Sequence, residues 1–192
     1  MDTLSHSLPA ESLHFELCTF EGFNFRQQSA IERVLTAEEV VNWDHDQEGE
    51  AEFWPAGDHA EVALVFRQRS AVSAAELLAL DRLLRELGGD STDYFLQIHY
   101  AVNVCGADLG SLSREDVEDN CLQVFYGSNF IDARHAAAYE LFELYYPEEY
   151  AVWEKSTCDG LSFDPDRFLD SPGFFVEEIR LADQVAILVA TC

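Results

Sequence analysis

The chain has 192 residues, of which 37 are Asp or Glu and 11 are Lys or Arg, so its formal net charge is −26. A chain this acidic lacks the clustered basic residues that bind nucleic-acid phosphates, and anionic membrane surfaces should repel it. However, 48% of the residues are hydrophobic, which is too many for a disordered acidic chain. The composition therefore predicts a globular protein that binds neither nucleic acid nor membrane directly.

The five cysteines are widely spaced and include no C-x-x-C pair, which argues against a disulfide framework and a zinc ribbon. No stretch approaches the ~18 consecutive apolar residues of a membrane span, and the first residues do not resemble a signal peptide. We therefore expect a reduced, cytoplasmic protein. Its length favours a single domain over residues 1–192, with residues 1–10 as a mobile tail.

In the first part of the chain, alternating apolar residues over 13–17 predict a half-buried strand. A capping-box spacing predicts a short helix over 36–43, and the polar segment 44–58 follows as an acidic loop. Residues 61–67 are apolar at alternate positions with further apolar residues between them, which predicts a strand covered on both faces.

The clearest helix signal lies between Ser73 and Gly88. Ser73 and Glu76 have the spacing of a capping box, leucines follow at helical intervals, and Gly88 stands where a C-cap glycine belongs. After this helix, residues 93–104 predict a long strand.

In the second half, residues 122–126 predict another strand. Asp132 is the expected N-cap of a helix over 133–146. Pro147 suits a first helical position, so it predicts a kink or a restart that continues to Lys155.

Residues 158–173 form the most irregular stretch, and their apolar residues predict a loop that packs against the core. Two strands, 174–181 and 185–191, follow with a tight turn between them. Together these elements predict an α+β fold. We expect a mixed or mainly antiparallel sheet of five or six strands, with three or four helices packed on it.

Five acids in the segment 44–52 occupy alternate positions. If the segment is extended, their carboxylates share one face at intervals of about 6.6 Å and form a linear anion; the alternative is a solvated acidic loop. The predicted helices over 133–155 carry a second group of acids. The acids expected to form one binding surface are Asp44, Asp46, Glu48, Glu50, Glu52, Glu140, Glu143, Glu148 and Glu149.

Aromatic residues recur at steps of three and four along the same predicted helices, which places them on one helical face. Such a face usually packs against the core, and the alternative is a partner interface, where Tyr and Trp are enriched. The residues are Tyr139, Phe142, Tyr146, Tyr150 and Trp153.

The segment 44–55 resembles part of an EF-hand calcium loop. Acids stand at loop positions one, three and five, and Gly49 occupies the sixth, where the turn is sharp. Pro55 replaces the bidentate Glu at position twelve, so the resemblance is incomplete. Since no complete metal motif is present, we expect neither a metal nor another cofactor. The candidate ligands considered are Asp44, Asp46, Glu48, His45 and His59.

Cys105 is the candidate nucleophile, because it is expected at the end of a strand just before Gly106. His99 or His135 would be its base. A buried, inert cysteine is the commoner case. The chain also has no nucleophile elbow, no dinucleotide-binding fingerprint and no P-loop, so the sequence favours a protein that is not an enzyme.

Three functions from different classes fit these features. The favoured one is a non-enzymatic acidic binding protein that mimics nucleic acid and neutralises a basic nucleic-acid-binding protein. It is similar in size and charge alone to anti-restriction, anti-CRISPR and nuclease-immunity proteins. The alternatives are a protein whose charge serves solubility only, and a small enzyme or ion-binding domain that uses Asp44, Asp46 and Glu48 or Cys105. No oligomeric state is predicted.

Overall fold

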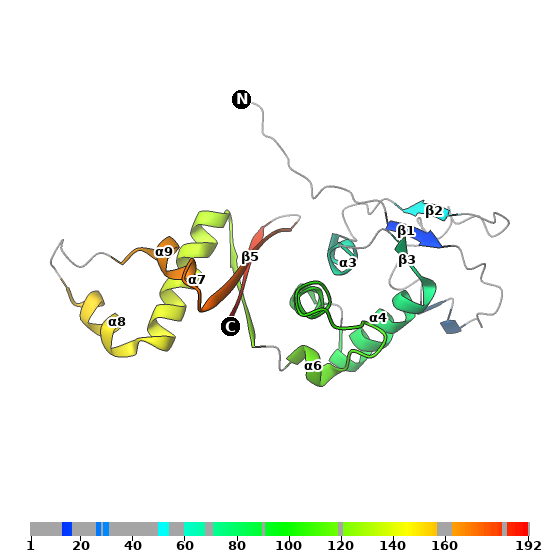
Figure 1. Cartoon of the computed structure of the whole chain (residues 1–192), viewed down its shortest axis with the longest axis horizontal. Coiled ribbons are helices and arrows are strands. Elements are labelled where there is room, and N and C mark those ends of the chain that lie inside the picture. Colours follow the sequence, from blue (N-terminus) through cyan, green and yellow to red (C-terminus); the bar gives the residue numbers. More distant parts are fainter. Residues whose placement is uncertain are drawn as a thin grey trace, which may run out of the picture. The chain divides into compact units, whose positions relative to one another are not determined.

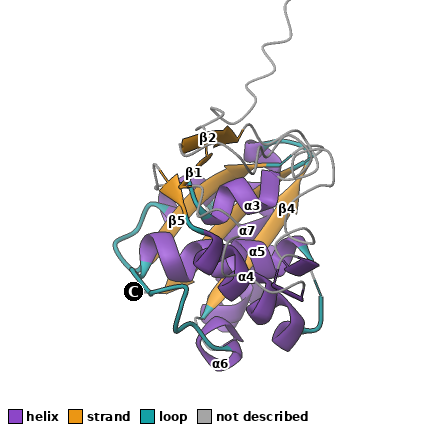
Figure 2. Ribbon diagram, turned by 90° about the vertical axis from the view of Figure 1, so that its right-hand side faces the viewer, coloured by secondary structure: helices purple, strands orange, loops and turns teal. Residues whose placement is uncertain are grey.

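A computed structural model of the chain divides it into two compact units, unit 1 (Met1–Asn120) and unit 2 (Cys121–Cys192) (Figure 1). Each unit is described by itself, and the single domain over 1–192 stays a prediction. Both helices and strands are present (Figure 2), which confirms the α+β class. The structure describes residues 13–16, 26–27, 29–30, 50–53, 60–67, 71–89, 91–118, 121–156, 163–181 and 184–191.

Unit 1 contains a three-stranded sheet in the order β2-β1-β3. Strand β1 (Leu13–Glu16) confirms the predicted strand at the start of the chain. It pairs antiparallel with β2 (Glu50–Phe53) and parallel with β3 (Ala71–Val72). The sheet therefore joins segments far apart in the sequence. The predicted tail over 1–10 and the predicted helix over 36–43 lie outside the described residues.

Helix α3 (Ala60–Val65) occupies the segment for which the sequence predicts a strand over 61–67. That prediction is wrong. Val62, Val65 and Phe66 are all buried in the core of unit 1. A helix buried around most of its circumference is apolar almost throughout, so its sequence resembles that of a central strand.

Helix α4 (Ala74–Leu87) confirms the predicted capping box. The Ser73 backbone N–H donates to Glu76 Oε2 at 2.9 Å, and the Glu76 N–H donates to Ser73 Oγ at 3.3 Å. The helix ends at Gly88, whose φ of 92° is left-handed and therefore favours glycine. Leu77, Leu80 and Leu83 are completely buried, so one face of α4 supplies much of the unit 1 core.

The predicted long strand over 93–104 is also wrong, since this segment is helical. Helix α5 (Thr92–His99) begins at Ser91, whose hydroxyl accepts from the Tyr94 N–H, and continues into a π-helix, η2 (Tyr100–Val104). Phe95, Ile98, Ala101 and Val102 of this segment are buried in the same core as α3 and α4. A short helix, α6 (Arg114–Glu118), completes the described part of unit 1.

Unit 2 contains a separate sheet in the order β4-β6-β5, with both pairs antiparallel. Strands β4 (Leu122–Gly127), β5 (Phe174–Arg180) and β6 (Val185–Thr191) confirm the three strands predicted for this half. The single sheet of five or six strands is wrong, because the described strands form two sheets of three. The described part also contains more helices than the three or four predicted.

Helix α7 (Phe130–Tyr145) packs against β4 and β6, where it shares a core with alternate residues of β6. Its N-cap is Asn129, and the prediction of Asp132 as the cap is wrong: Asn129 Oδ1 accepts from the Asp132 N–H at 3.0 Å, so Asp132 lies in the first turn. A side chain at Gly127 would place a Cβ 2.8 Å from Ala133 N. Glycine therefore lets the end of β4 approach α7.

Helix α8 (Pro147–Glu154) begins at Pro147, which confirms the predicted restart. The expected irregular loop contains a five-residue helix, α9 (Pro165–Leu169), capped by Asp164. As predicted, this segment packs down, since Leu169 is buried in the unit 2 core. No helix in the described part of the chain is both long and apolar enough to cross a membrane.

Candidate interaction surface

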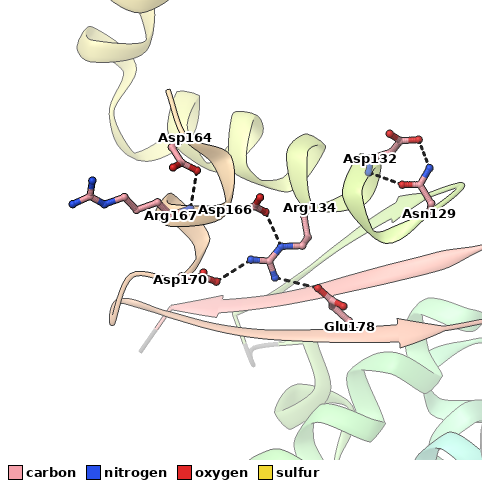
Figure 3. A network of polar contacts seen from close by, with 8 residues as sticks. All are labelled: Asn129, Asp132, Arg134, Asp164, Asp166, Arg167, Asp170 and Glu178. Atoms are coloured by element: carbon pink, nitrogen blue, oxygen red, sulfur yellow. Dashed lines mark hydrogen bonds and ion pairs between the residues drawn. The ribbon is translucent and has the colours of Figure 1, made fainter. Parts of the chain in front are cut away.

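One group of carboxylates in unit 2 surrounds Arg134 of α7 (Figure 3). Its guanidinium bonds Asp166 at 3.1 Å from Nε, Asp170 at 2.9 Å from Nη2 and Glu178 at 3.2 Å from Nη1. Only 17% of the Arg134 side chain is exposed. Partial burial opposes its charge, but the three carboxylates outweigh this effect and raise the pKa of the guanidinium. These acids therefore hold α7, α9 and β5 together.

A second group of carboxylates, on α7 and α8, has no such counterion. Glu140, Glu143, Glu148 and Glu149 are all exposed. Within the described residues, none of the four makes a hydrogen bond or an ion pair with a basic side chain. These are the second-half acids that the sequence predicts as part of a binding surface. The structure thus leaves their charge available to solvent or to a partner.

An aromatic cluster lies beside these acids. Phe142 is at its centre and stacks on Phe163 with ring centroids 4.5 Å apart and planes within 5°. Tyr139 stacks on Trp153 with centroids 5.4 Å apart. None of the rings is fully buried. The cluster contains Tyr139, Phe142, Tyr145, Tyr146, Tyr150, Trp153, Phe163, Phe168 and Phe174.

The five aromatic residues singled out in the sequence all belong to this cluster, which confirms that they pack on a common side. The acids affect the cluster electrostatically. The pKa of the Tyr150 phenol is raised. Partial burial is the largest cause, and repulsion from Glu143 and Glu154 adds to it. Aromatic rings and unpaired carboxylates are therefore close enough to act on the same ligand.

Large apolar side chains are also exposed on α7 and α8. In the described part of the chain, seven large hydrophobic residues are exposed, and four of them lie where α7 meets α8. We call these four residues, together with the four unpaired glutamates, the α7–α8 surface. The apolar members are Leu144, Tyr145, Tyr146 and Val152.

Two of these features were not predicted from the sequence. Arg134 has acidic partners between 32 and 44 residues away, so no local pattern indicates its role. The exposure of Leu144 has no local signal either, because Leu144 follows the buried residues Ala137 and Leu141 by seven and three residues and so shares their helical face. The exposure of Val152 does have a signal, because Val152 follows the exposed Glu148 by four residues.

Of the candidate catalytic residues, Cys105 and His99 lie in unit 1 and His135 lies in unit 2. His99 is only 1% exposed, and its Nδ1 lies 2.9 Å from the backbone oxygen of Leu64. Cys105 is exposed, but it follows the π-helix, so its expected place at a strand end is wrong. Among the described residues, no hydrogen bond joins the Cys105 thiol to His99. His135 belongs to unit 2, where its ring meets Tyr139 edge-on.

His99 has a packing role. The last carbonyls of a helix lack partners within the helix. At the end of α3, the Leu64 oxygen faces His99 Nδ1, and the Val65 oxygen accepts a hydrogen bond from Asn103 Nδ2 at 2.9 Å. Asn103 of η2 thereby satisfies the Val65 carbonyl, and His99 of α5 packs against the Leu64 carbonyl, which also accepts from the Arg67 N–H at 3.2 Å.

The candidate metal ligands Asp44, Asp46, Glu48, His45 and His59 all lie outside the described residues. Where side chains are described, no cluster of His, Cys, Asp and Glu could hold a metal ion. The acidic row is seen only at its end, where Glu50 and Glu52 belong to β2, in the extended conformation expected of them. The convergence of this row with the α7–α8 surface therefore stays a prediction.

Comparison with known proteins adds no relative: no family model matches the chain, and no curated protein or solved structure matches it either.

Proposed function

We propose that this protein is a non-enzymatic acidic binding protein whose partner is a basic nucleic-acid-binding protein. The observation that carries the proposal is the contrast between the two groups of carboxylates in unit 2. Three acids share the single positive charge of Arg134, whereas Glu140, Glu143, Glu148 and Glu149 are exposed on neighbouring helices and have no basic partner among the described residues. An unpaired anionic surface attracts a cationic partner from a distance.

The wider charge distribution supports the same proposal. Unit 2 contains 13 acidic and 4 basic residues, and unit 1 contains 24 acidic and 7 basic residues. Both units are therefore anionic, so a basic partner is attracted over distances up to about one Debye length, ~8 Å at physiological salt. Direct binding of nucleic acid or of an anionic membrane is opposed by the same field.

Mimicry of nucleic acid is the finer part of the proposal. A mimic must present carboxylates in a row, because duplex DNA carries one charge per ~1.7 Å of its axis. The segment 44–52 would supply such a row, and the four glutamates of the α7–α8 surface would extend it. On this proposal the two groups of acids occupy the same basic groove.

Displacement of DNA tests the proposed function directly. Fluorescent duplex DNA is bound to each of several purified basic DNA-binding proteins, including core histones and a restriction endonuclease, and the full chain is added. We expect it to release the DNA at low salt. Without DNA, direct binding of the chain to the same proteins should weaken by about tenfold or more between ~50 and ~200 mM salt, because the attraction is screened.

Two variants with the same change in net charge identify the acids responsible. One replaces Glu140, Glu143, Glu148 and Glu149 with Gln, and the other replaces Asp44, Asp46, Glu48 and Glu50 with the corresponding amides. If both groups bind, each variant loses most of the competition. If total charge alone matters, a third variant with four acids changed elsewhere loses as much. Failure of the wild-type chain to displace DNA from every protein tested would refute the proposed function.

A further inference from the structure

Strand β5 forms one edge of the unit 2 sheet, since the strand order is β4-β6-β5. In an antiparallel pair, the backbone N–H and C=O groups of alternate residues point toward the partner strand, and those of the residues between them point away. The turn between β5 and β6 fixes this alternation, because the Leu181 N–H donates to the Gln184 oxygen at 2.9 Å. The backbone groups of Val176, Glu178 and Arg180 therefore point away from β6.

The outer edge of β5 has unpaired backbone groups along its second half. The first outward N–H, that of Phe174, donates to the Ser171 oxygen at 3.1 Å. Among the residues that the structure describes, no backbone hydrogen bond is made on the outer side by Val176, Glu178 or Arg180. A row of unpaired N–H and C=O groups is a template for the pairing of another strand.

Two side chains of this edge carry opposite charges on the same face of the strand, because Glu178 and Arg180 are two residues apart. Glu178 bonds Arg134 through Oε1 and keeps 42% of its side chain exposed, so its second oxygen can accept a further hydrogen bond (Figure 3). The Arg180 guanidinium carbon lies 5.6 Å from the centre of the Phe130 ring. Arg180 is exposed, and within the described part of the chain no acid bonds it. Both charged groups can therefore take a partner.

A second copy of β5, placed antiparallel against this edge, matches these charges in one register. When Glu178 of each copy lies opposite Arg180 of the other, opposite charges face each other at two places, and Ile179 faces its own equivalent between them. Two other registers also pair at least two of the unpaired residues. One places Glu177 opposite Glu177, and the other places Glu178 opposite Glu178, where like charges repel. The side chains therefore select the first register.

The net charge of the chain opposes association of two copies, but the opposition is small at this edge. Charges separated by more than a Debye length, ~8 Å at physiological salt, are largely screened, whereas residues directly opposite each other in a sheet lie only ~5 Å apart. Self-complementary charges also suit a two-fold axis, which is the commonest symmetry of homo-oligomers. The charge order of the edge therefore favours a second copy of the chain as its occupant.

We infer that two copies of the chain associate by antiparallel pairing of β5, with Glu178 of each copy opposite Arg180 of the other. The two sheets of unit 2 then form one antiparallel sheet of six strands, in the order β4-β6-β5-β5-β6-β4. This inference does not depend on the proposed function, because it concerns contacts between copies of the chain alone.

Charge reversal in the full chain tests the register. Sedimentation equilibrium should show a wild-type dimer whose fraction rises with concentration. Glu178→Arg brings arginines opposite each other and Arg180→Glu brings glutamates opposite each other, so each variant alone should dimerise at least about tenfold more weakly. A mixture of the two variants restores opposite charges at both places, so it should form a heterodimer about as tightly as the wild type.

Lys155→Glu is the control for the change in net charge that Arg180→Glu makes. Lys155 is exposed at the C-terminal end of α8, so this variant should dimerise like the wild type. Circular dichroism verifies that each variant is folded. Recovery in the mixture also excludes unfolding as the cause of the loss, because an unfolded variant cannot be restored by the other one.

Arg180→Pro tests the backbone pairing. The Arg180 N–H points away from β6, so proline leaves the β5–β6 hydrogen bonds in place and removes a donor from the dimer. Arg180→Ala removes the same charge but keeps the N–H. The proline variant should therefore dimerise about fivefold more weakly than the alanine variant, since one hydrogen bond per copy is lost.

Three results would overturn the inference. A wild-type chain that stays monomeric up to ~1 mM has no such interface. If that monomeric chain displaces DNA from basic proteins, and Arg180→Pro weakens the displacement more than Arg180→Ala does, the edge pairs with the basic partner instead of a second copy. If the wild type dimerises but the charge variants do so equally well, or if their mixture restores nothing, another surface or register forms the dimer.

Discussion

Two groups of carboxylates in unit 2 have opposite environments. Around Arg134, carboxylates from α9 and β5 converge on one guanidinium and join segments that are distant in the sequence. On α7 and α8, Glu140, Glu143, Glu148 and Glu149 have no counterion among the described residues. Net charge alone therefore does not reveal function, because the carboxylates bonded within the fold and those left without a basic partner have different roles.

The largest effect is expected from Arg134→Met, which removes the common partner of three carboxylates. We expect the free energy of unfolding to fall by about 2 kcal/mol, since three charge-assisted hydrogen bonds are lost but the carboxylates remain partly solvated. Urea denaturation measures this change.

Arg167→Met is the control for the loss of one positive charge. Figure 3 shows the Arg167 side chain pointing away from Arg134, and its guanidinium makes no ion pair within the described residues. This variant should change the unfolding free energy by no more than about 0.5 kcal/mol. Equal losses for both variants would show that the network around Arg134 has no special role.

A smaller effect on the unfolding free energy, of opposite sign, is expected from the unpaired glutamates of α7. Glu140 and Glu143 lie three residues apart, and Glu143 is near the C-terminus of α7, where negative charge opposes the helix dipole. Replacing both with Gln should therefore stabilise the protein by about 0.5 kcal/mol in urea denaturation at low salt. The gain should shrink as salt is added.

The matched pair Glu148→Gln with Glu149→Gln should act in the other direction. These two glutamates lie in the first turn of α8, where negative charge is favourable, so their loss should cost a few tenths of a kcal/mol. If both pairs changed the unfolding free energy in the same direction, the interaction of these charges with the helix dipoles would not be the cause.

The smallest effect concerns an engaged carboxylate in unit 1. Asp116 accepts from the Ser113 hydroxyl and N–H, and these hydrogen bonds lower the pKa of Asp116 from its ordinary value of 3.8. Because the folded pKa is lowered, its contribution to stability is complete above about pH 4 and is lost as the pH falls through the lowered pKa.

An NMR titration of the Asp116 carboxyl measures this pKa. In Ser113→Ala the hydroxyl is removed, and the pKa should rise toward the ordinary value. An unchanged pKa in this variant would show that the Ser113 side chain is not its cause.

Local signals in the sequence predicted several elements correctly. The capping box at Ser73, the glycine at 88 and the proline at 147 act within one helical turn of themselves, so they mark helix ends without any tertiary information. The strands of unit 2 were equally clear, because short apolar runs are bounded there by turn residues.

The two wrong strands have a common cause. Segments 60–65 and 92–104 form helices that pack on each other in one core, and each contains a run of buried apolar residues that resembles a strand. Periodicity cannot distinguish such a helix from a central strand. His99 and Asn103 were the available clue, since they lie four residues apart on one helical face and reach the carbonyls at the end of α3.

The sequence by itself determined the charge, both ends of α4, the start of α8 and the aromatic stripe, because each of these is fixed by composition or by contacts within a few residues. Only the tertiary structure decided that Arg134 bonds three acids and that Glu140, Glu143, Glu148 and Glu149 are left exposed. The physical reason is distance along the chain. The acids that bond Arg134 lie 32 or more residues away, and folding alone brings them within hydrogen-bonding reach of its guanidinium.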